Sequence, residues 1–125
     1  MTIDVVGWPV VHMHFAGQID EAEFVGWMRR TSALLARQQP FSIVTSSAAD
    51  MQLPANYRQL EAVWYKANKA VLGQYCLGLA RLASSDEQYQ HLNGKAMHNA
   101  WPCAYFVSLS LDQAMTWAKQ QLVEQ

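Results

Sequence analysis

Short apolar runs alternate with segments of helical periodicity, and this order limits most strongly what the chain can fold into. The runs are Ile3–Val6, Val10–Phe15, 41–44, Cys76–Leu82 and 103–109. A turn at 7–9 predicts that the first two runs form a hairpin. Strand followed by helix, repeated along a chain, favours parallel strands. We therefore predict one α/β domain over residues 1–125, with a mixed β-sheet, elements in the order β-β-α-β-α-β-α-β-α and helices mainly on one face.

Capping residues mark where several of the predicted helices begin. Asp20 followed by Glu23 resembles a capping box, and Ser84 with Glu87 and Ser110 with Gln113 repeat the spacing. Gly94 weakens the third predicted helix by about 1 kcal/mol relative to alanine, so we expect its second half to be irregular.

The second predicted helix starts near Pro54 and is expected to end at Gly73. The residues predicted to face inward on it are Leu60, Val63, Trp64, Ala67 and Val71. Those predicted to form its outer face are Arg58, Tyr65, Lys66 and Lys69. Tyrosine and arginine are enriched in interfaces, so this outer face is a candidate surface for binding a partner.

Charge and hydropathy exclude several classes of function. The net charge is −1 and only 15% of residues are charged, so the electrostatic footprint of a nucleic-acid binder is absent. No apolar run approaches the roughly 18 residues of a membrane span, and the start of the chain does not resemble a signal peptide. We therefore expect a cytoplasmic protein, in which Cys76 and Cys103 are structural thiols rather than a disulfide.

Two histidines form the sharpest local pattern. His12 and His14 stand two apart on a predicted strand, so they share one face, as strand-borne metal ligands do. Asp4, on the other strand of the hairpin, is the nearest acid that the topology suggests. A metal-binding protein or a small enzyme using His12 and His14 is thus one alternative.

Hydroxyl groups gather at the end of the third predicted strand. Thr45, Ser46 and Ser47 lie where ligands bind in open α/β sheets, beyond the carboxyl end of a strand. Neither nucleotide-binding fingerprint accompanies them, and no serine sits in a Gly-x-Ser-x-Gly elbow. The sequence therefore predicts no cofactor and favours a non-catalytic protein, with ligand or partner contacts at these three residues and at Arg58, Trp64, Tyr65 and Trp101.

Several packing motifs resemble the STAS family, whose best-known members are anti-sigma-factor antagonists, and in particular its small bacterial SpoIIAA-like (STAS/SEC14-like) relatives. The motifs are Phe15-x-Gly17-x-Ile19-Asp20, Cys76-x-Gly78-x-Ala80, and Pro102-Cys103 leading to Phe106. The antagonists carry a phosphorylatable serine in a loop after the third strand. The corresponding segment here, 45–50, holds Ser46, Ser47 and Asp50 but no glycine. The resemblance thus implies a phosphoserine switch as a second alternative.

The leading hypothesis is a regulatory module of STAS-like fold that binds a protein partner or a small apolar ligand. We also expect a homodimer, because the chain holds five tryptophans and a mixed sheet leaves an edge or a face to be covered.

Overall fold

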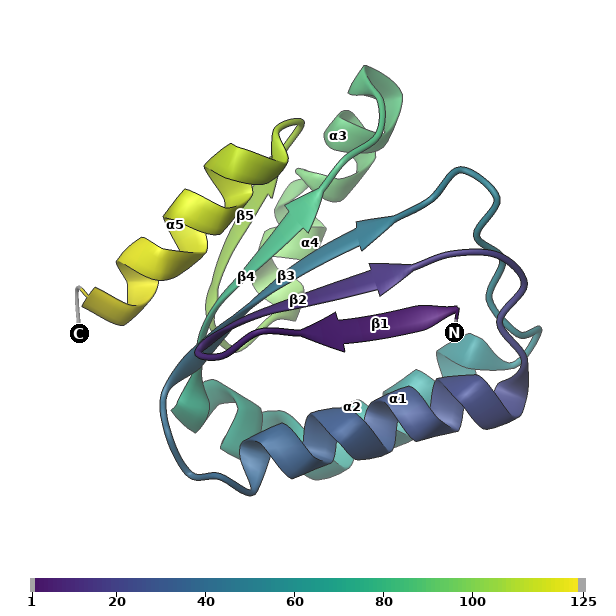
Figure 1. The fold of residues 1–125 in the computed structure, drawn as a ribbon, viewed down its shortest axis with the longest axis horizontal. Coiled ribbons are helices and arrows are strands. Elements are labelled where there is room, and N and C mark those ends of the chain that lie inside the picture. Colours follow the sequence, from purple (N-terminus) through teal and green to yellow (C-terminus); the bar gives the residue numbers. More distant parts are fainter. Residues whose placement is uncertain (1, 124–125) are drawn as a thin grey trace.

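The computed structural model describes residues 2–123, which form a five-stranded mixed sheet. The strands are β1 (Ile3–Val6), β2 (Val10–Phe15), β3 (Phe41–Ser47), β4 (Cys76–Leu82) and β5 (Ala104–Ser108). They lie side by side in chain order (Figure 1). The β1–β2 pair is antiparallel and the other three pairs are parallel. The predicted hairpin and parallel strands are thereby confirmed.

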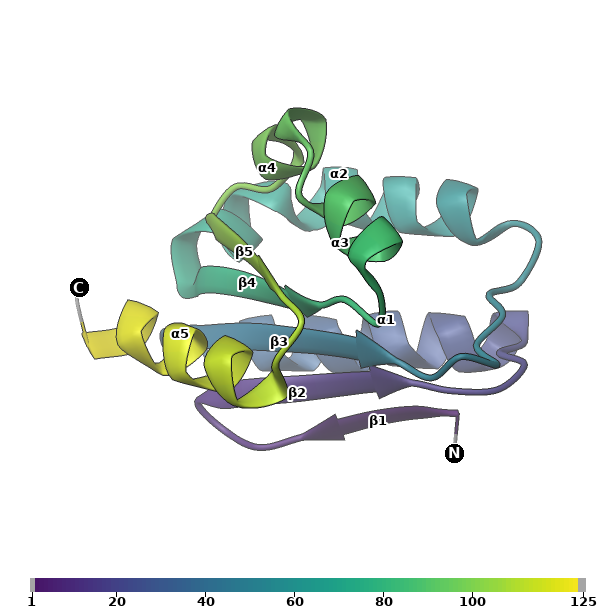
Figure 2. The same cartoon turned by 90° about the horizontal axis from the view of Figure 1, so that it is seen from above.

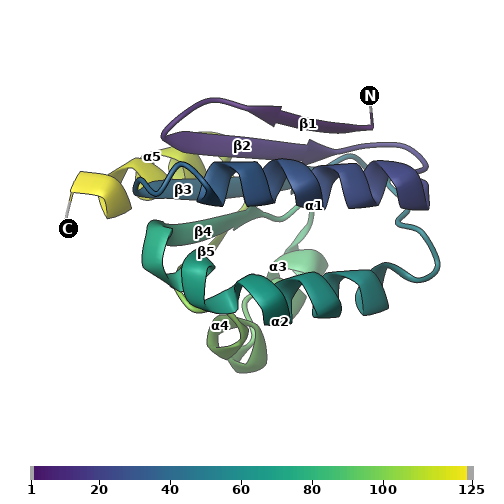
Figure 3. The same ribbon diagram turned by 90° about the horizontal axis from the view of Figure 1, so that it is seen from below.

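Helices cover both faces of the sheet unequally. They are α1 (Glu21–Leu35), α2 (Tyr57–Tyr75), α3 (Asp86–Leu92), α4 (Lys95–Ala100) and α5 (Leu111–Val123). The helices α1 and α2 pack against each other on one face, and α5 lies on the opposite face (Figures 1 and 3). The short helices α3 and α4 contact β5 and extend the first layer beyond that strand (Figure 2). None of the helices within residues 2–123 is both long and apolar enough to cross a membrane.

The predicted cap of α1 is confirmed, whereas the predicted cap of α3 is wrong. The Asp20 side chain accepts a 2.8 Å hydrogen bond from the Glu23 amide, as predicted. The cap of α3 is Ser85, which accepts from the Gln88 amide, so the predicted pairing of Ser84 with Glu87 is wrong by one residue. Gly94 splits the third predicted helix in two, because it adopts an extended conformation as the N-cap of α4.

The predicted inward face of α2 is confirmed for Leu60 and Trp64, which pack against the core, and is wrong for Val63, Ala67 and Val71, which are exposed. Val63 is 69% exposed and Val71 is 38% exposed, whereas Leu72 is buried. The half-buried Tyr65 joins Trp64 in facing the core, because two large aromatic groups bury more apolar area than two valines. Gly73 does not end the helix, which continues to Tyr75.

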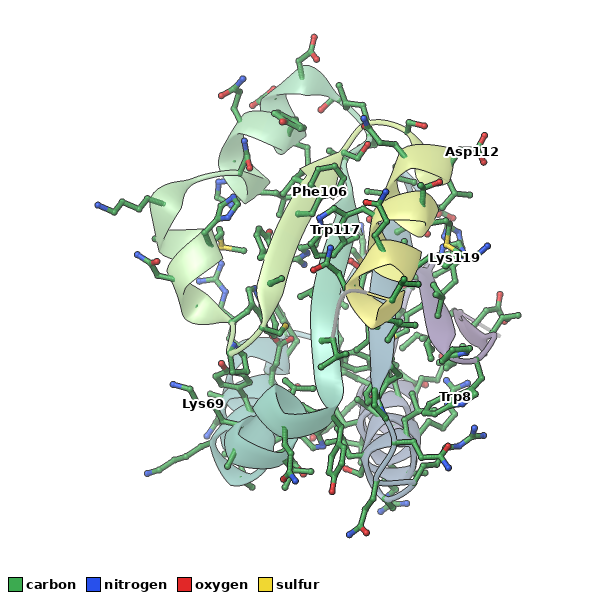
Figure 4. All side chains as sticks on the ribbon, turned by 90° about the vertical axis from the view of Figure 1, so that its left-hand side faces the viewer. Trp8, Lys69, Phe106, Asp112, Trp117 and Lys119 are labelled. Atoms are coloured by element: carbon green, nitrogen blue, oxygen red, sulfur yellow. The ribbon has the colours of Figure 1, made fainter. Side chains whose placement is uncertain are left out.

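The helix α5 approaches the sheet closely because the facing residues are small. Ala114 and Ala118 are fully buried against Val44 and Ala80. Trp117 stacks on Phe106 of β5, with ring centroids 5.2 Å apart (Figure 4). The two layers of helices thus differ: α5 packs tightly on the sheet, whereas a cavity lies between the sheet and the opposite layer.

Candidate functional site

A cavity of about 220 Å³ lies between the sheet and the layer formed by α1 to α4. Native interiors hold few voids larger than a water molecule, and an apolar cavity of roughly 150 Å³ is enough to bind benzene. The floor of the cavity is formed by alternate side chains of the sheet, namely Met13, Phe15, Ile43, Thr45, Leu79 and Arg81. Its volume and mostly apolar lining therefore suit a small organic molecule.

Aromatic side chains from the helices line the cavity on the side opposite the sheet. The indole of Trp64 donates a 2.9 Å hydrogen bond to the Ser32 hydroxyl, which joins α2 to α1. The hydroxyl of Tyr65 donates a 2.7 Å hydrogen bond to the carbonyl of Ala100 at the end of α4, and Trp101 packs edge-on against the Tyr65 ring. Tyr65 thus lines the cavity, and its predicted place on the outer face of α2 is wrong.

Polar groups gather at one end of this cavity, near the carboxyl ends of β3 and β4. Thr45 pairs with Arg81 in the sheet register, and both side chains point to the cavity side. Ser47 lies two residues further along the same face of β3. Neither the Thr45 nor the Ser47 hydroxyl makes a side-chain hydrogen bond to another group within residues 2–123. Two hydroxyl groups therefore remain able to bond a ligand.

Glu61 and Arg81 are the charged residues in the cavity lining. Burial raises the pKa of the Glu61 carboxyl, and the positive charge of Arg81 lowers it in part. Burial raises the pKa of the Tyr105 hydroxyl and the nearby Arg81 guanidinium lowers it in part, while this hydroxyl donates a 2.9 Å hydrogen bond to the Leu92 carbonyl. No carboxylate within the described residues forms an ion pair with Arg81.

Sequence reasoning missed both of these residues, although each leaves a signal. Arg81 interrupts an otherwise apolar strand and lies two residues from Leu79, so strand alternation places it on the core face. Glu61 precedes Trp64 and Tyr65 by three and four residues, which places it on their face of the helix.

The two histidines lie on the other face of the sheet and converge on one serine. His12 Nε2 and His14 Nδ1 each lie 2.7 Å from the Oγ atom of Ser46, which is 7% exposed. Burial lowers the pKa of the His12 imidazole, and the neighbouring His14 lowers it further. No third histidine, cysteine or acid joins them into a metal-binding group within residues 2–123.

Most of the predicted contact residues border the cavity. These are Thr45, Ser46, Ser47, Trp64, Tyr65 and Trp101. Ser46 borders it from the strand while its hydroxyl faces the histidines. Arg58 does not line the cavity, because its exposed side chain donates to the hydroxyl of Tyr57 on the surface.

The end of the cavity away from Arg81 carries two thiols and an indole. Cys76 and Cys103 are free, and both line the cavity. The neighbouring Cys103 thiol and burial together raise the pKa of Cys76. The indole nitrogen of Trp101 is buried and has no hydrogen-bond partner among the described residues.

The mixed five-stranded sheet and its flanking helices define an α/β domain of STAS-like architecture, and solved structures bear this out. One is an uncharacterised protein of the DUF3478 family with a SpoIIAA-like fold from Shewanella loihica PV-4. It is 10% identical, with a TM-score of 0.67 over 93% of this chain and 91% of the other. An anti-sigma factor antagonist from Mycobacterium paratuberculosis is 18% identical, with a TM-score of 0.54 over 94% and 93% of the two chains. The predicted STAS-like, SpoIIAA-like fold is thereby confirmed.

Comparison of sequences adds no closer relationship. No protein-family model matches the chain, and no curated protein matches it. The likeness to both solved structures therefore concerns the fold.

Proposed function

We propose that this protein is a non-catalytic, cytoplasmic binding module that holds a small, largely apolar ligand between its sheet and the helices α1 to α4. The observation that carries this proposal is the 220 Å³ cavity, whose lining is mostly apolar and holds its two charged residues, Glu61 and Arg81. Ligand sites are typically concave and mostly apolar, with a few polar groups that orient the ligand. The cavity favours a small ligand over a protein partner, because a protein that only bound a partner at its surface could have a filled core.

Tryptophan fluorescence tests this proposal, because Trp27, Trp64 and Trp101 all line the cavity. Titration with 1-octanol should give a saturable change in emission. Leu79→Phe, which fills the cavity floor, should abolish the change. Leu34→Phe is the matched control, since Leu34 is half-buried against the core but does not line the cavity.

Native mass spectrometry of the purified wild-type protein provides a measurement that needs no variant. A co-purified small molecule that leaves the protein on mild denaturation would support the proposal. Absence of a co-purified molecule, together with no saturable response to 1-octanol or to its carboxylate analogue, would overturn it.

A protein partner is the second candidate function, and the outer face of α2 favours it. Val63 is 69% exposed there beside the exposed Lys66 and Lys69. One solved structure of this fold is an anti-sigma factor antagonist. Cross-linking in the native cells should capture a defined partner that the Lys66→Glu, Lys69→Glu double variant loses. Equal capture by the double variant would contradict this candidate.

A homodimer remains part of the proposal. The strand β5 is an edge of the sheet within residues 2–123, and its half-buried Phe106 stacks on Trp117 beside that edge. Light scattering coupled to size-exclusion chromatography should give twice the chain mass. A monomer at all concentrations would contradict the dimer.

Phosphorylation in the 45–50 segment is the remaining alternative from the sequence. Ser46 is buried and bonded to two histidines, whereas the half-buried Ser47 borders the cavity. Intact mass spectrometry of protein from native cells should detect a phosphate if the switch operates, and Ser47→Ala should remove it.

A further inference from the structure

The polar end of the cavity indicates which chemical class of ligand it takes. Arg81 stands near the carboxyl end of β4, while Cys76 stands at its beginning, and both line the same cavity. Five residues of strand at about 3.3 Å each separate them by about 16 Å. The cavity is therefore elongated, with its charged groups at one end and its apolar bulk extending towards the other.

Charge at this polar end is incompletely balanced. The Arg81 guanidinium keeps its charge at any physiological pH. Its described protein neighbours are the neutral hydroxyl of Tyr105 and the more distant carboxyl of Glu61. A guanidinium near an apolar cavity is stabilised by an anion that it can bond through two parallel N–H groups.

Uncommitted hydroxyl groups lie on β3, the strand next to Arg81. Thr45 is its direct neighbour across the β3–β4 pair, and Ser47 follows on the same face of β3. Neither hydroxyl bonds another group through its side chain within residues 2–123. A carboxylate accepts hydrogen bonds through two oxygens, so Arg81 and one of these hydroxyls together match its bonding capacity.

We propose that the ligand is a medium-chain monocarboxylate, with its carboxylate on Arg81 and its apolar body along the cavity towards Cys76 and Trp101. This inference rests on the proposed function and specifies the ligand class. If roughly 150 Å³ holds the six carbons of benzene, 220 Å³ holds about nine non-hydrogen atoms. Octanoate, with about ten, is the probe that matches this size.

The test compares three probes of equal chain length on the wild-type protein by tryptophan fluorescence and calorimetry. Octanoate should bind about tenfold more tightly than 1-octanol, because a charge-assisted pair is worth more than a neutral hydrogen bond. Octylammonium should bind more weakly than 1-octanol, because Arg81 repels it. If 1-octanol binds as tightly as octanoate, the ligand class is wrong while the proposed function stands. Tightest binding of octylammonium would make Glu61 the recognition group and overturn the proposal.

A variant pair locates the effect at Arg81. Arg81→Gln should weaken octanoate binding about tenfold and leave 1-octanol binding within about twofold. Arg29→Gln is the matched control, because Arg29 is exposed on α1 and should change neither affinity. If Arg81→Gln weakened the binding of octanoate and 1-octanol equally, Arg81 would only maintain the shape of the cavity. That result would contradict the proposal. Failure of every probe to bind wild-type protein would instead overturn the proposed function itself.

Arg81→Lys keeps the charge without the planar fork and serves if Arg81→Gln does not fold. It should bind octanoate more weakly than wild type and still more tightly than 1-octanol. A folded Arg81→Lys protein that binds octanoate as tightly as the wild type does would show that the planar fork does not hold the carboxylate, and would contradict the proposal.

Discussion

The indole of Trp64 donates a 2.9 Å hydrogen bond to the hydroxyl of Ser32, and this contact ties together the two long helices that cover the cavity. The bond is partly buried, and removing either partner leaves the other without it. We expect Ser32→Ala and Trp64→Phe each to lower the free energy of unfolding by about 1 kcal/mol or more. Urea denaturation measures both, and a double variant that costs the sum of the two would show that the pair is not coupled.

Trp101 presents the opposite situation, because its buried indole N–H has no partner in the described part of the chain. An unsatisfied buried donor costs about 1–3 kcal/mol, so Trp101→Phe removes an unfavourable term along with some packing. We expect Trp101→Phe to destabilise the protein at least about 1 kcal/mol less than Trp64→Phe does. If urea titrations showed equal destabilisation by Trp101→Phe and Trp64→Phe, they would contradict the conclusion that the Trp101 N–H is unsatisfied.

Gly78 is required where α5 crosses β4. A Cβ atom at this position would lie 2.8 Å from Gln121 Cγ and 2.9 Å from the Trp117 ring. We expect Gly78→Ala to cost about 1–3 kcal/mol of stability through overpacking. Trp117→Leu in the same chain should recover part of the loss, because it removes the ring that the new methyl meets.

Gly26 supplies the matched control for Gly78. It lies within α1, and a Cβ atom there would meet nothing within 4 Å. Gly26→Ala should therefore stabilise the protein by about 0.5–1 kcal/mol. Thermal melting that shows the same sign of change for both glycines would argue against close packing of α5.

His12 makes stability depend on pH. Its pKa in the folded protein is lowered, first by burial and then by His14. Below its unfolded pKa of about 6.5, the unfolded chain takes up the proton more readily than the folded chain. The contribution of His12 is therefore complete above that pH and is lost as the pH falls.

The measurement is the melting temperature of wild type and His12→Gln between pH 8 and pH 5. The wild type should lose more stability over this interval than the variant. His91→Gln is the control, since His91 is exposed on α3, and it should follow the wild type. A His12→Gln profile parallel to that of the wild type would show that His12 titrates normally.

The architecture of this protein follows largely from local patterns. Val11 and Met13 alternate with His12 and His14, and this alternation alone assigned the two faces of β2. Asp20 identified the start of α1, because a cap depends on residues only three positions apart. The face of α2 could not be predicted in this way, because valines and aromatics compete along the helix and distant contacts decide which are buried.

The sequence by itself determined the succession of strands and helices and the faces of the strands, since these depend on periodicity and on short-range caps. Its packing motifs supplied the resemblance to the STAS family. Only the tertiary structure decided that Glu61, Thr45 and Arg81 meet at one end of a cavity. They come from α2, β3 and β4, three elements that are brought together only when the helices pack on the sheet. That arrangement depends on how whole layers pack, and no local pattern in the chain encodes it.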